Sequence, residues 1–139
     1  MKKILLAVFI LLTSSLTVLG HSELVNSNPA NGSIVKTMPS AVQLKLDEAV
    51  EMSFSTFKVY AYIGTVTNDK LRAFARAKIA LKNDAAARAD AGVSSTGTTK
   101  TVSVQLKSKL KPGVYVVMWK ALGIDTHTVE GYIYFTDKP

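Results

Sequence analysis

Hydrophobic and polar residues alternate along several short segments of the chain, with the two-residue period of a strand that has one buried face. The clearest segments are 42–46, 57–62, 101–106, 114–120 and 132–136, and a shorter one lies at 22–26 near the start of the chain. Turn signals rich in Pro, Gly, Asn and Ser separate them. About seven short strands with such turns predict an all-β domain, an antiparallel Greek-key β-sandwich or barrel of immunoglobulin-like or cupredoxin-like type.

The segment from Leu71 to Gly92 gives mixed signals. Apolar and basic residues alternate over 73–82, which favours a strand, whereas the high content of Ala and Arg favours a helix. We predict a strand over Ala75 to Leu81, a short helical turn near Asp84 to Ala91, and a flexible loop over 93–100, where Ser, Thr and Gly dominate.

The first twenty residues have the order of a secretory signal peptide. Two lysines precede an apolar stretch, 4–12, and Val18 and Gly20 suit the positions three and one before a cleavage site. The apolar stretch is shorter than the roughly 20 residues that span a bilayer. We therefore expect cleavage after Gly20, which leaves one exported domain, 21–139, with no membrane insertion after processing.

Composition and charge limit the chemistry that this domain can perform. The chain has no cysteine, so a metal site must use nitrogen and oxygen ligands, with methionine as the only sulfur. The formal charge of +7 falls to +5 when Lys2 and Lys3 are removed, and no run of Lys or Arg indicates a nucleic-acid partner. A serine nucleophile elbow and a phosphate-binding glycine loop are both missing, so nucleophilic catalysis has no support in the sequence. We predict a protein that is not an enzyme.

The two histidines suggest a metal site. Cleavage after Gly20 would make His21 the first residue, whose free α-amine and own imidazole can close one chelate ring on a metal. Because the ordinary pKa of an α-amine is about 8, a metal can displace its proton near neutral pH. The second histidine, His127, lies two residues after Asp125, and on an extended segment residues two apart point to the same side.

Three nitrogens and one oxygen from these residues would suit the tetragonal geometry of Cu(II), while zinc, which prefers a tetrahedron, would also bind them. A solvated loop is the alternative interpretation of the Asp125-Thr-His127 sequence. The copper interpretation also requires the start of the first strand and the loop 122–130 to lie at the same end of the domain.

Further motifs accompany this constellation along the domain. They are the Ser27-Asn-Pro-Ala-Asn-Gly32 turn, the Leu46-Asp47-Glu48 segment, the Leu110-Lys-Pro-Gly-Val-Tyr115 turn, and Trp119 followed by Asp125-Thr-His127 and Gly131. With His21, this set resembles the CopC-type periplasmic copper-resistance proteins. The resemblance implies a Greek-key β domain in the periplasm that binds one Cu(II) through His21, Asp125 and His127. It also implies that Glu48 lies on or beside the copper, although a solvated carboxylate at a strand end is the alternative.

One expected family feature is missing from the sequence. The best-known members carry a methionine-rich loop that binds Cu(I), whereas the corresponding region here, 60–82, contains neither methionine nor histidine. Met38, Met52 and Met118 are scattered, and we interpret them as core residues. Trp119 is interpreted in the same way. We therefore predict a single Cu(II) site.

The resemblance implies a monomeric periplasmic protein that sequesters Cu(II) or delivers it to an inner-membrane copper transporter. A copper-dependent polysaccharide monooxygenase is one alternative, because such enzymes also bind copper with an N-terminal histidine; an Asp125 ligand would block the position that oxygen needs. An adhesion or assembly domain of immunoglobulin type without a metal is another.

Overall fold

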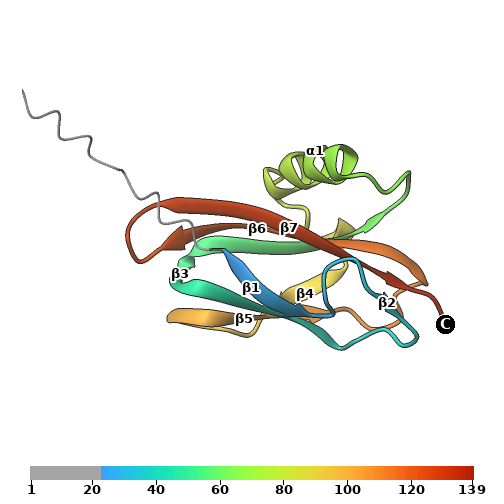
Figure 1. Ribbon diagram of the computed structural model, residues 1–139, viewed down its shortest axis with the longest axis horizontal. Helices are drawn as coiled ribbons and strands as arrows, with labels where there is room; N and C mark the ends of the chain where they lie inside the picture. Colours follow the sequence, from blue (N-terminus) through green and yellow to red (C-terminus); the bar gives the residue numbers. More distant parts are fainter. Residues whose placement is uncertain (1–22) are drawn as a thin grey trace, which may run out of the picture.

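Seven strands and one α-helix make up most of the computed structural model, which describes residues 23–139 (Figure 1). The predicted signal peptide, its cleavage site and His21 lie outside the described residues. The strands are β1 (Leu24–Asn28), β2 (Ile34–Val35), β3 (Ala41–Tyr62), β4 (Asp90–Val93), β5 (Thr98–Leu106), β6 (Gly113–Gly123) and β7 (Thr128–Asp137). The helix α1 spans Asn68–Ile79, and a short 3-10 turn, η1, spans Ala85–Ala87.

The long strand β3 joins the two halves of the fold. Its first part, Ala41–Lys45, pairs with β5, and its last part, Thr56–Tyr62, pairs with β6. Register shifts between these parts re-aim the strand, as bulges do. The strand order is β2-β7-β6-β3-β5-β4, with β1 also on β3, and only the short β2–β7 pair is parallel. The predicted antiparallel Greek-key β-sandwich is confirmed.

The core consists of the alternating apolar residues that predicted the strands. On β3, Val42, Leu44 and Leu46 are buried, and the polar residues between them are exposed. They pack against Val59, later in the same strand, and against buried residues of the other strands, which include Val102, Val104, Val117, Trp119, Ile133 and Phe135. Met118 is also buried, and Met38 and Met52 pack against the core, which agrees with their interpretation as core residues.

The region expected to contain a strand over Ala75–Leu81 forms α1 instead, so that prediction was wrong. Thr67 caps the helix, because its side chain accepts a hydrogen bond from the Lys70 backbone N–H at 3.3 Å. Leu71 and Ala75, four residues apart, form its buried stripe against a second apolar cluster on β3 and β6. The alternation over 73–82 came largely from alanines, which are compatible with either structure, and their high helix propensity prevailed.

The segments after α1 differ in smaller ways from the prediction. The 3-10 turn η1 lies inside the stretch expected to contain a short helical turn, but β4 begins at Asp90 within the same stretch. The expected loop over 93–100 is reduced to the residues between Val93 and Thr98, because β4 and β5 extend into it from either side.

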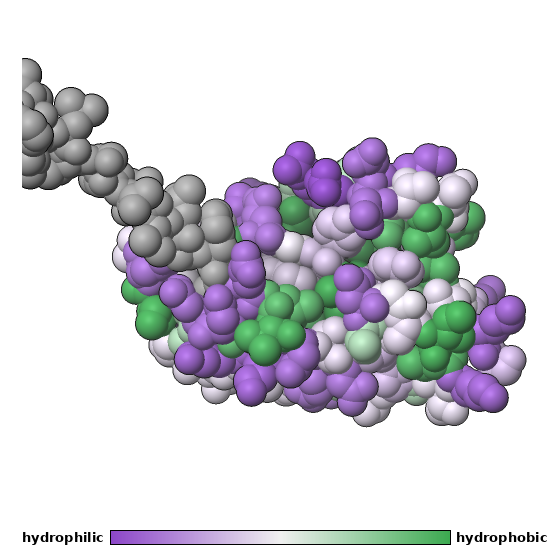
Figure 2. Space-filling model, viewed as in Figure 1, coloured by the Kyte–Doolittle hydropathy of each residue, from purple (hydrophilic) through white to green (hydrophobic). Residues whose placement is uncertain are grey.

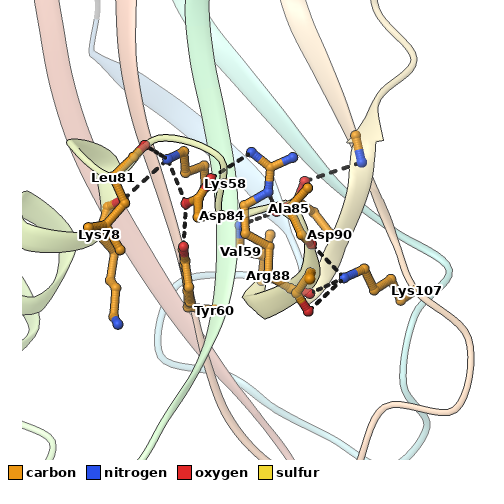
Figure 3. A network of polar contacts seen from close by, with 12 residues as sticks. Lys58, Val59, Tyr60, Lys78, Leu81, Asp84, Ala85, Arg88, Asp90 and Lys107 are labelled. Carbon is orange, nitrogen blue, oxygen red and sulfur yellow. Dashed lines mark hydrogen bonds and ion pairs between the residues drawn. The ribbon is translucent and has the colours of Figure 1, made fainter.

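Lys58 anchors the end of α1 to the sheet. It lies on β3, is only 3% exposed, and donates through Nζ to the carbonyl of Leu81 and to Oδ2 of Asp84, both at 2.7 Å (Figure 3). This hydrogen bond to Asp84 is the main reason that the pKa of Asp84 is lowered to about 2. The Tyr60 hydroxyl also donates to Asp84, and burial is the main reason that the pKa of Tyr60 is raised to about 12.

A neighbouring carboxylate anchors the start of β4. Asp90 is almost fully buried, and its Oδ1 accepts a hydrogen bond from the Val59 backbone N–H at 2.8 Å and lies 3.3 Å from Nε of Arg88 (Figure 3). Charged side chains thus attach the end of α1, the segment that follows it and the start of β4 to strand β3. Within residues 23–139, every helix is too short or too polar to cross a bilayer.

Candidate metal centre

Asp125 and His127 lie in the tight turn between β6 and β7. Gly123 donates its backbone N–H to the His127 carbonyl, and its own carbonyl accepts from the Thr126 N–H, each at 2.9 Å. Thr126 adopts a left-handed conformation with a φ of 71°. This conformation lets the chain reverse within these few residues. The turn therefore fixes the positions of Asp125 and His127 relative to each other.

The two side chains contact each other directly. Oδ2 of Asp125 lies 3.1 Å from Nδ1 of His127, and Oδ1 accepts a hydrogen bond from the His127 backbone N–H at 3.1 Å. The hydrogen bond from the His127 side chain is the largest cause of the lowered pKa of Asp125, which favours its ionised form. The His127 side chain is 65% exposed and that of Asp125 is 34% exposed, so an ion can reach both from solvent.

The turn rests against the middle of β3. Ile124 donates its backbone N–H to the Ala49 carbonyl at 3.2 Å, and Val50 lies opposite Gly123 in the β3–β6 register. The residue before Ala49, Glu48, carries a carboxylate oxygen, Oε2, that is buried and has no hydrogen-bond partner among the described residues. Buried polar atoms are nearly always paired, so this oxygen differs from the solvated carboxylate of the alternative interpretation. A bound cation is one kind of partner that would satisfy it.

The start of β1 lies beside the same part of β3. Glu23 donates its backbone N–H to Oδ1 of Asp47 at 2.7 Å, and its carbonyl accepts from the Asp47 backbone N–H at 3.0 Å. In Figure 1, the beginning of β1 and the β6–β7 turn lie at the same end of the sheet. The geometric condition stated above is therefore met as far as Glu23.

His21 is two residues before Glu23. Two residues of extended chain reach about 7 Å. Within residues 23–139, no group of three or more His, Cys, Asp or Glu side chains is arranged to hold a metal. The described part of the centre therefore supplies the Asp125–His127 pair and the nearby Glu48, and a complete metal site would need a further ligand from outside this range.

Asp47 was missed as a functional residue, although it fixes the direction in which the chain enters. The alternating pattern of β3 predicts only that Asp47 faces solvent, and it is exposed. The signal that could have identified it is the Asp47-Glu48 pair at the end of the alternating segment.

Trp119 packs against Gly131. The two residues are opposite each other on β6 and β7, and a Cβ atom at position 131 would lie 2.3 Å from Cζ2 of Trp119. The indole thus occupies the space that a side chain at Gly131 would need. Trp119 is 5% exposed and belongs to the main apolar cluster, which confirms its interpretation as a core residue.

Comparison with known proteins identifies the family. A family model described as the CopC domain matches residues 24–138, which is nearly all of the described chain. The chain belongs to the CopC family. Its expected family membership, stated above from the sequence motifs, is confirmed.

Two curated relatives and one solved structure illustrate the match. The chain is 30% identical over 118 residues to Copper resistance protein C of Pseudomonas syringae pv. tomato, covering 85% of this chain and 81% of that protein. It is 30% identical over 121 residues to Copper transport protein CutJ of Bacillus subtilis, but that match covers 86% of this chain and only 18% of the relative. The crystal structure of PcoC, a methionine-rich copper resistance protein from Escherichia coli, has the same fold, with a TM-score of 0.60 and 24% identity over 85% of this chain and 99% of PcoC.

Proposed function

We propose that this chain is a periplasmic Cu(II)-binding protein that sequesters copper or delivers it to an inner-membrane copper transporter. In this proposal, cleavage after Gly20 frees the amine of His21. That amine, the His21 imidazole, Asp125 and His127 bind one copper ion. Glu48 completes the centre as an axial ligand or as a carboxylate beside the ion. The protein acts as a monomer and catalyses no reaction.

The observation that carries the proposal is that two distant parts of the chain meet on one short segment of β3. Asp47 holds the chain at Glu23, and Ala49, two residues later, holds the Asp125–His127 turn. Residues near the start of the domain and residues near its end can therefore share one ion. The buried Oε2 of Glu48 lies between those two anchors and has no hydrogen-bond partner within residues 23–139, which supports a positively charged ligand at this position.

Membership of the CopC family supports copper as the ion, because matched relatives are named for copper resistance and copper transport. The nitrogen-rich ligand set supports Cu(II) over Cu(I), since softer sulfur ligands favour the reduced ion. Delivery to a transporter is supported by the CutJ match, in which this domain corresponds to a small part of a longer copper transport protein.

The decisive experiment is a Cu(II) titration of the chain that begins at His21, in which calorimetry measures binding and electron paramagnetic resonance reports the geometry of the bound ion. We expect saturation at one equivalent and a tetragonal, nitrogen-rich spectrum. The matched control is the same chain with its N-terminal amine acetylated, which keeps the His21 imidazole but removes the free amine. We expect acetylation to weaken binding as strongly as His21→Ala, by at least about 100-fold, because both remove the chelate ring.

Variants at the turn test the other ligands. His127→Ala and Asp125→Ala should each lower copper affinity by at least about tenfold, whereas Thr126→Ala, between them, should not. Wild-type affinity in the acetylated chain or in His127→Ala would refute this centre. Sedimentation of the copper-loaded protein would test the monomer, and transfer of copper to a purified transporter would distinguish delivery from sequestration.

A further inference from the structure

A cavity of about 380 Å³ lies between α1 and the outer face of strands β6 and β7. Its volume falls within the range that is usual for small-molecule sites, about 300–1,000 Å³. It is separate from the candidate metal centre, since Glu48, Asp125 and His127 do not line it. The helix α1 that forms its outer wall belongs to the region 60–82, where the resemblance had implied a methionine-rich loop. The cavity thus arises from the part of the chain that departs most from the expected pattern.

The inner wall of the cavity is apolar. Ile79 of α1 and the rings of Tyr132 and Tyr134 of β7 line it, and all three are half-buried and pack against the apolar cluster that contains Met118. Met118 and Trp119 also line the cavity, but they are only 1% and 5% exposed, and as neighbours on β6 their side chains point to opposite faces of the sheet. A ligand in the cavity would therefore cover Ile79 and the two tyrosine rings and remove their apolar surface from water.

The outer rim of the cavity is positively charged. Arg72 and Arg76, one helical turn apart on α1, both line it. Arg72 has only a loose ion pair, 3.7 Å long, with the exposed Asp69, and within residues 23–139 no carboxylate forms an ion pair with Arg76. Figure 2 shows strongly hydrophilic residues over α1 and paler or hydrophobic ones beneath it. Both guanidinium groups can therefore turn towards a ligand without breaking a strong interaction.

The rim keeps a net positive charge. Glu130 is the one carboxylate among the described residues that line the cavity, against two guanidinium groups, and its own ion pair with Lys120 is loose, at 3.8 Å. Asn31 uses its Oδ1 to accept a hydrogen bond from the Tyr134 backbone N–H at 3.1 Å. This arrangement leaves the amide N–H groups of Asn31 available as donors. The rim thus offers two guanidinium groups and an amide, all of them donors that suit an anion.

We propose that this cavity, bounded by Arg72, Arg76, Asn31 and Tyr132, binds a small organic carboxylate with an apolar body. The carboxylate contacts the guanidinium groups, and the apolar body lies against Ile79 and the rings of Tyr132 and Tyr134. A simple inorganic anion would use only the rim, and a neutral apolar molecule would use only the wall. The cavity has a charged rim on one side and an apolar wall on the other, so its ligand should carry both an anionic group and an apolar body. The inference goes beyond the proposed function and does not require copper.

Trp119 provides the measurement, because it is the only tryptophan of the chain and lines the cavity. Metal-free protein, prepared without a carboxylate chelator, is titrated with phenylacetate while the tryptophan fluorescence is recorded. Acetate, inorganic phosphate and the neutral phenylacetamide are the matched probes. We expect a saturable change with phenylacetate, at an affinity at least about tenfold higher than for any of the three others, since each of them lacks one half of the recognition.

Paired variants test the role of the arginines. Arg72→Gln combined with Arg76→Gln should lower the affinity for phenylacetate at least about tenfold and leave that for phenylacetamide unchanged, because only the charged contact is removed. Lys70→Gln combined with Lys82→Gln removes the same charge from exposed positions nearby that do not line the cavity, and should have little effect. Arg76→Lys should restore part of the loss in the single Arg76→Gln variant.

Several results would overturn the inference. One is the absence of saturation with phenylacetate up to tens of millimolar, the weak end of specific small-ligand binding. Another is equal binding of acetate or phosphate, which would mean that the apolar wall takes no part. A third is an equal loss in the lysine variants, which would mean that the effect comes from general surface charge.

Discussion

Replacing Glu48 by leucine should separate the stability of the domain from its affinity for copper. The Oε2 atom of Glu48 is buried without a hydrogen-bond partner among the described residues. Leaving a buried polar atom unsatisfied costs about 1–3 kcal/mol, and more when the group is charged. Removing it should therefore raise the free energy of unfolding of the metal-free protein by about 1–3 kcal/mol, unlike most core substitutions, which lower it.

The expected change is large enough for a thermal melt. For a domain of this size, 1 kcal/mol corresponds to a shift in Tm of about 3–6 °C. The same variant should bind Cu(II) at least about tenfold more weakly, because it lacks the carboxylate proposed to lie on or beside the ion. Wild-type protein should gain about 2.7 kcal/mol from Cu(II) at one hundred times its Kd, and Glu48→Leu should gain clearly less at the same concentration.

Melts followed by circular dichroism, without metal and with free Cu(II) at one hundred times the wild-type Kd, measure both effects in one assay. The matched control is Glu130→Leu, since the Glu130 side chain is half exposed. Loss of the Glu130 carboxylate should change the free energy of unfolding by about 0.5 kcal/mol or less. A Glu48→Leu variant that is less stable without metal and binds copper as wild type does would mean that Glu48 has a purely structural role. The proposed contribution of Glu48 to the centre would then be wrong.

Three further predictions concern the scaffold. Gly131→Ala should lower the free energy of unfolding by about 1–3 kcal/mol in urea titrations and shift the tryptophan emission, because the new Cβ would overlap Trp119. Lys58→Met should speed amide hydrogen exchange in α1 by at least about tenfold while the sheet remains protected, since Lys58 holds the end of the helix, and an unchanged α1 would contradict this role. Burial and Asp84 raise the pKa of Tyr60 to about 12. The neutral Tyr60 hydroxyl should therefore contribute fully to stability below pH 10, and this contribution should be lost as the pH rises from 10 to 12. Tyr60→Phe should flatten this pH dependence of the free energy of unfolding in urea titrations.

The sequence predicted the strands well because each has one buried face. Val42, Leu44 and Leu46 alternate with exposed residues, and this pattern has the same meaning in any sandwich. The pattern failed on the outer face of the last part of β3. Lys58 and Tyr60 occupy the polar positions of the alternation, yet both are buried, because α1 and the segment after it cover them. A residue pattern within one strand cannot reveal a helix that packs on it from another part of the chain.

The sequence predicted which side chains form the candidate site, but not the backbone contacts that position them. The Asp125-Thr-His127 spacing predicted a pair, and the structure brings the two side chains within 3.1 Å. The contacts that position the pair could not be predicted, because they involve the carbonyl of Ala49 and the backbone N–H of Ile124, which any residue could provide. Asp47 was overlooked for a related reason, since its partner is the backbone of Glu23.

The position of the candidate centre follows from how β3 changes its partners. Val50 and Glu51 of β3 pair with both β5 and β6, but residues 47–49, inside the register shift before them, pair with neither strand, so their backbone is free to bind other segments. The Glu23 and Ile124 backbones use that freedom at Asp47 and Ala49. A one-residue slip of a strand reverses which side chains face inward. The register shift between Lys45 and Val50 therefore decides whether Oε2 of Glu48 is buried or exposed. A deletion within this bulge should therefore abolish the contribution of Glu48 to copper binding even if the two halves of β3 keep their partners.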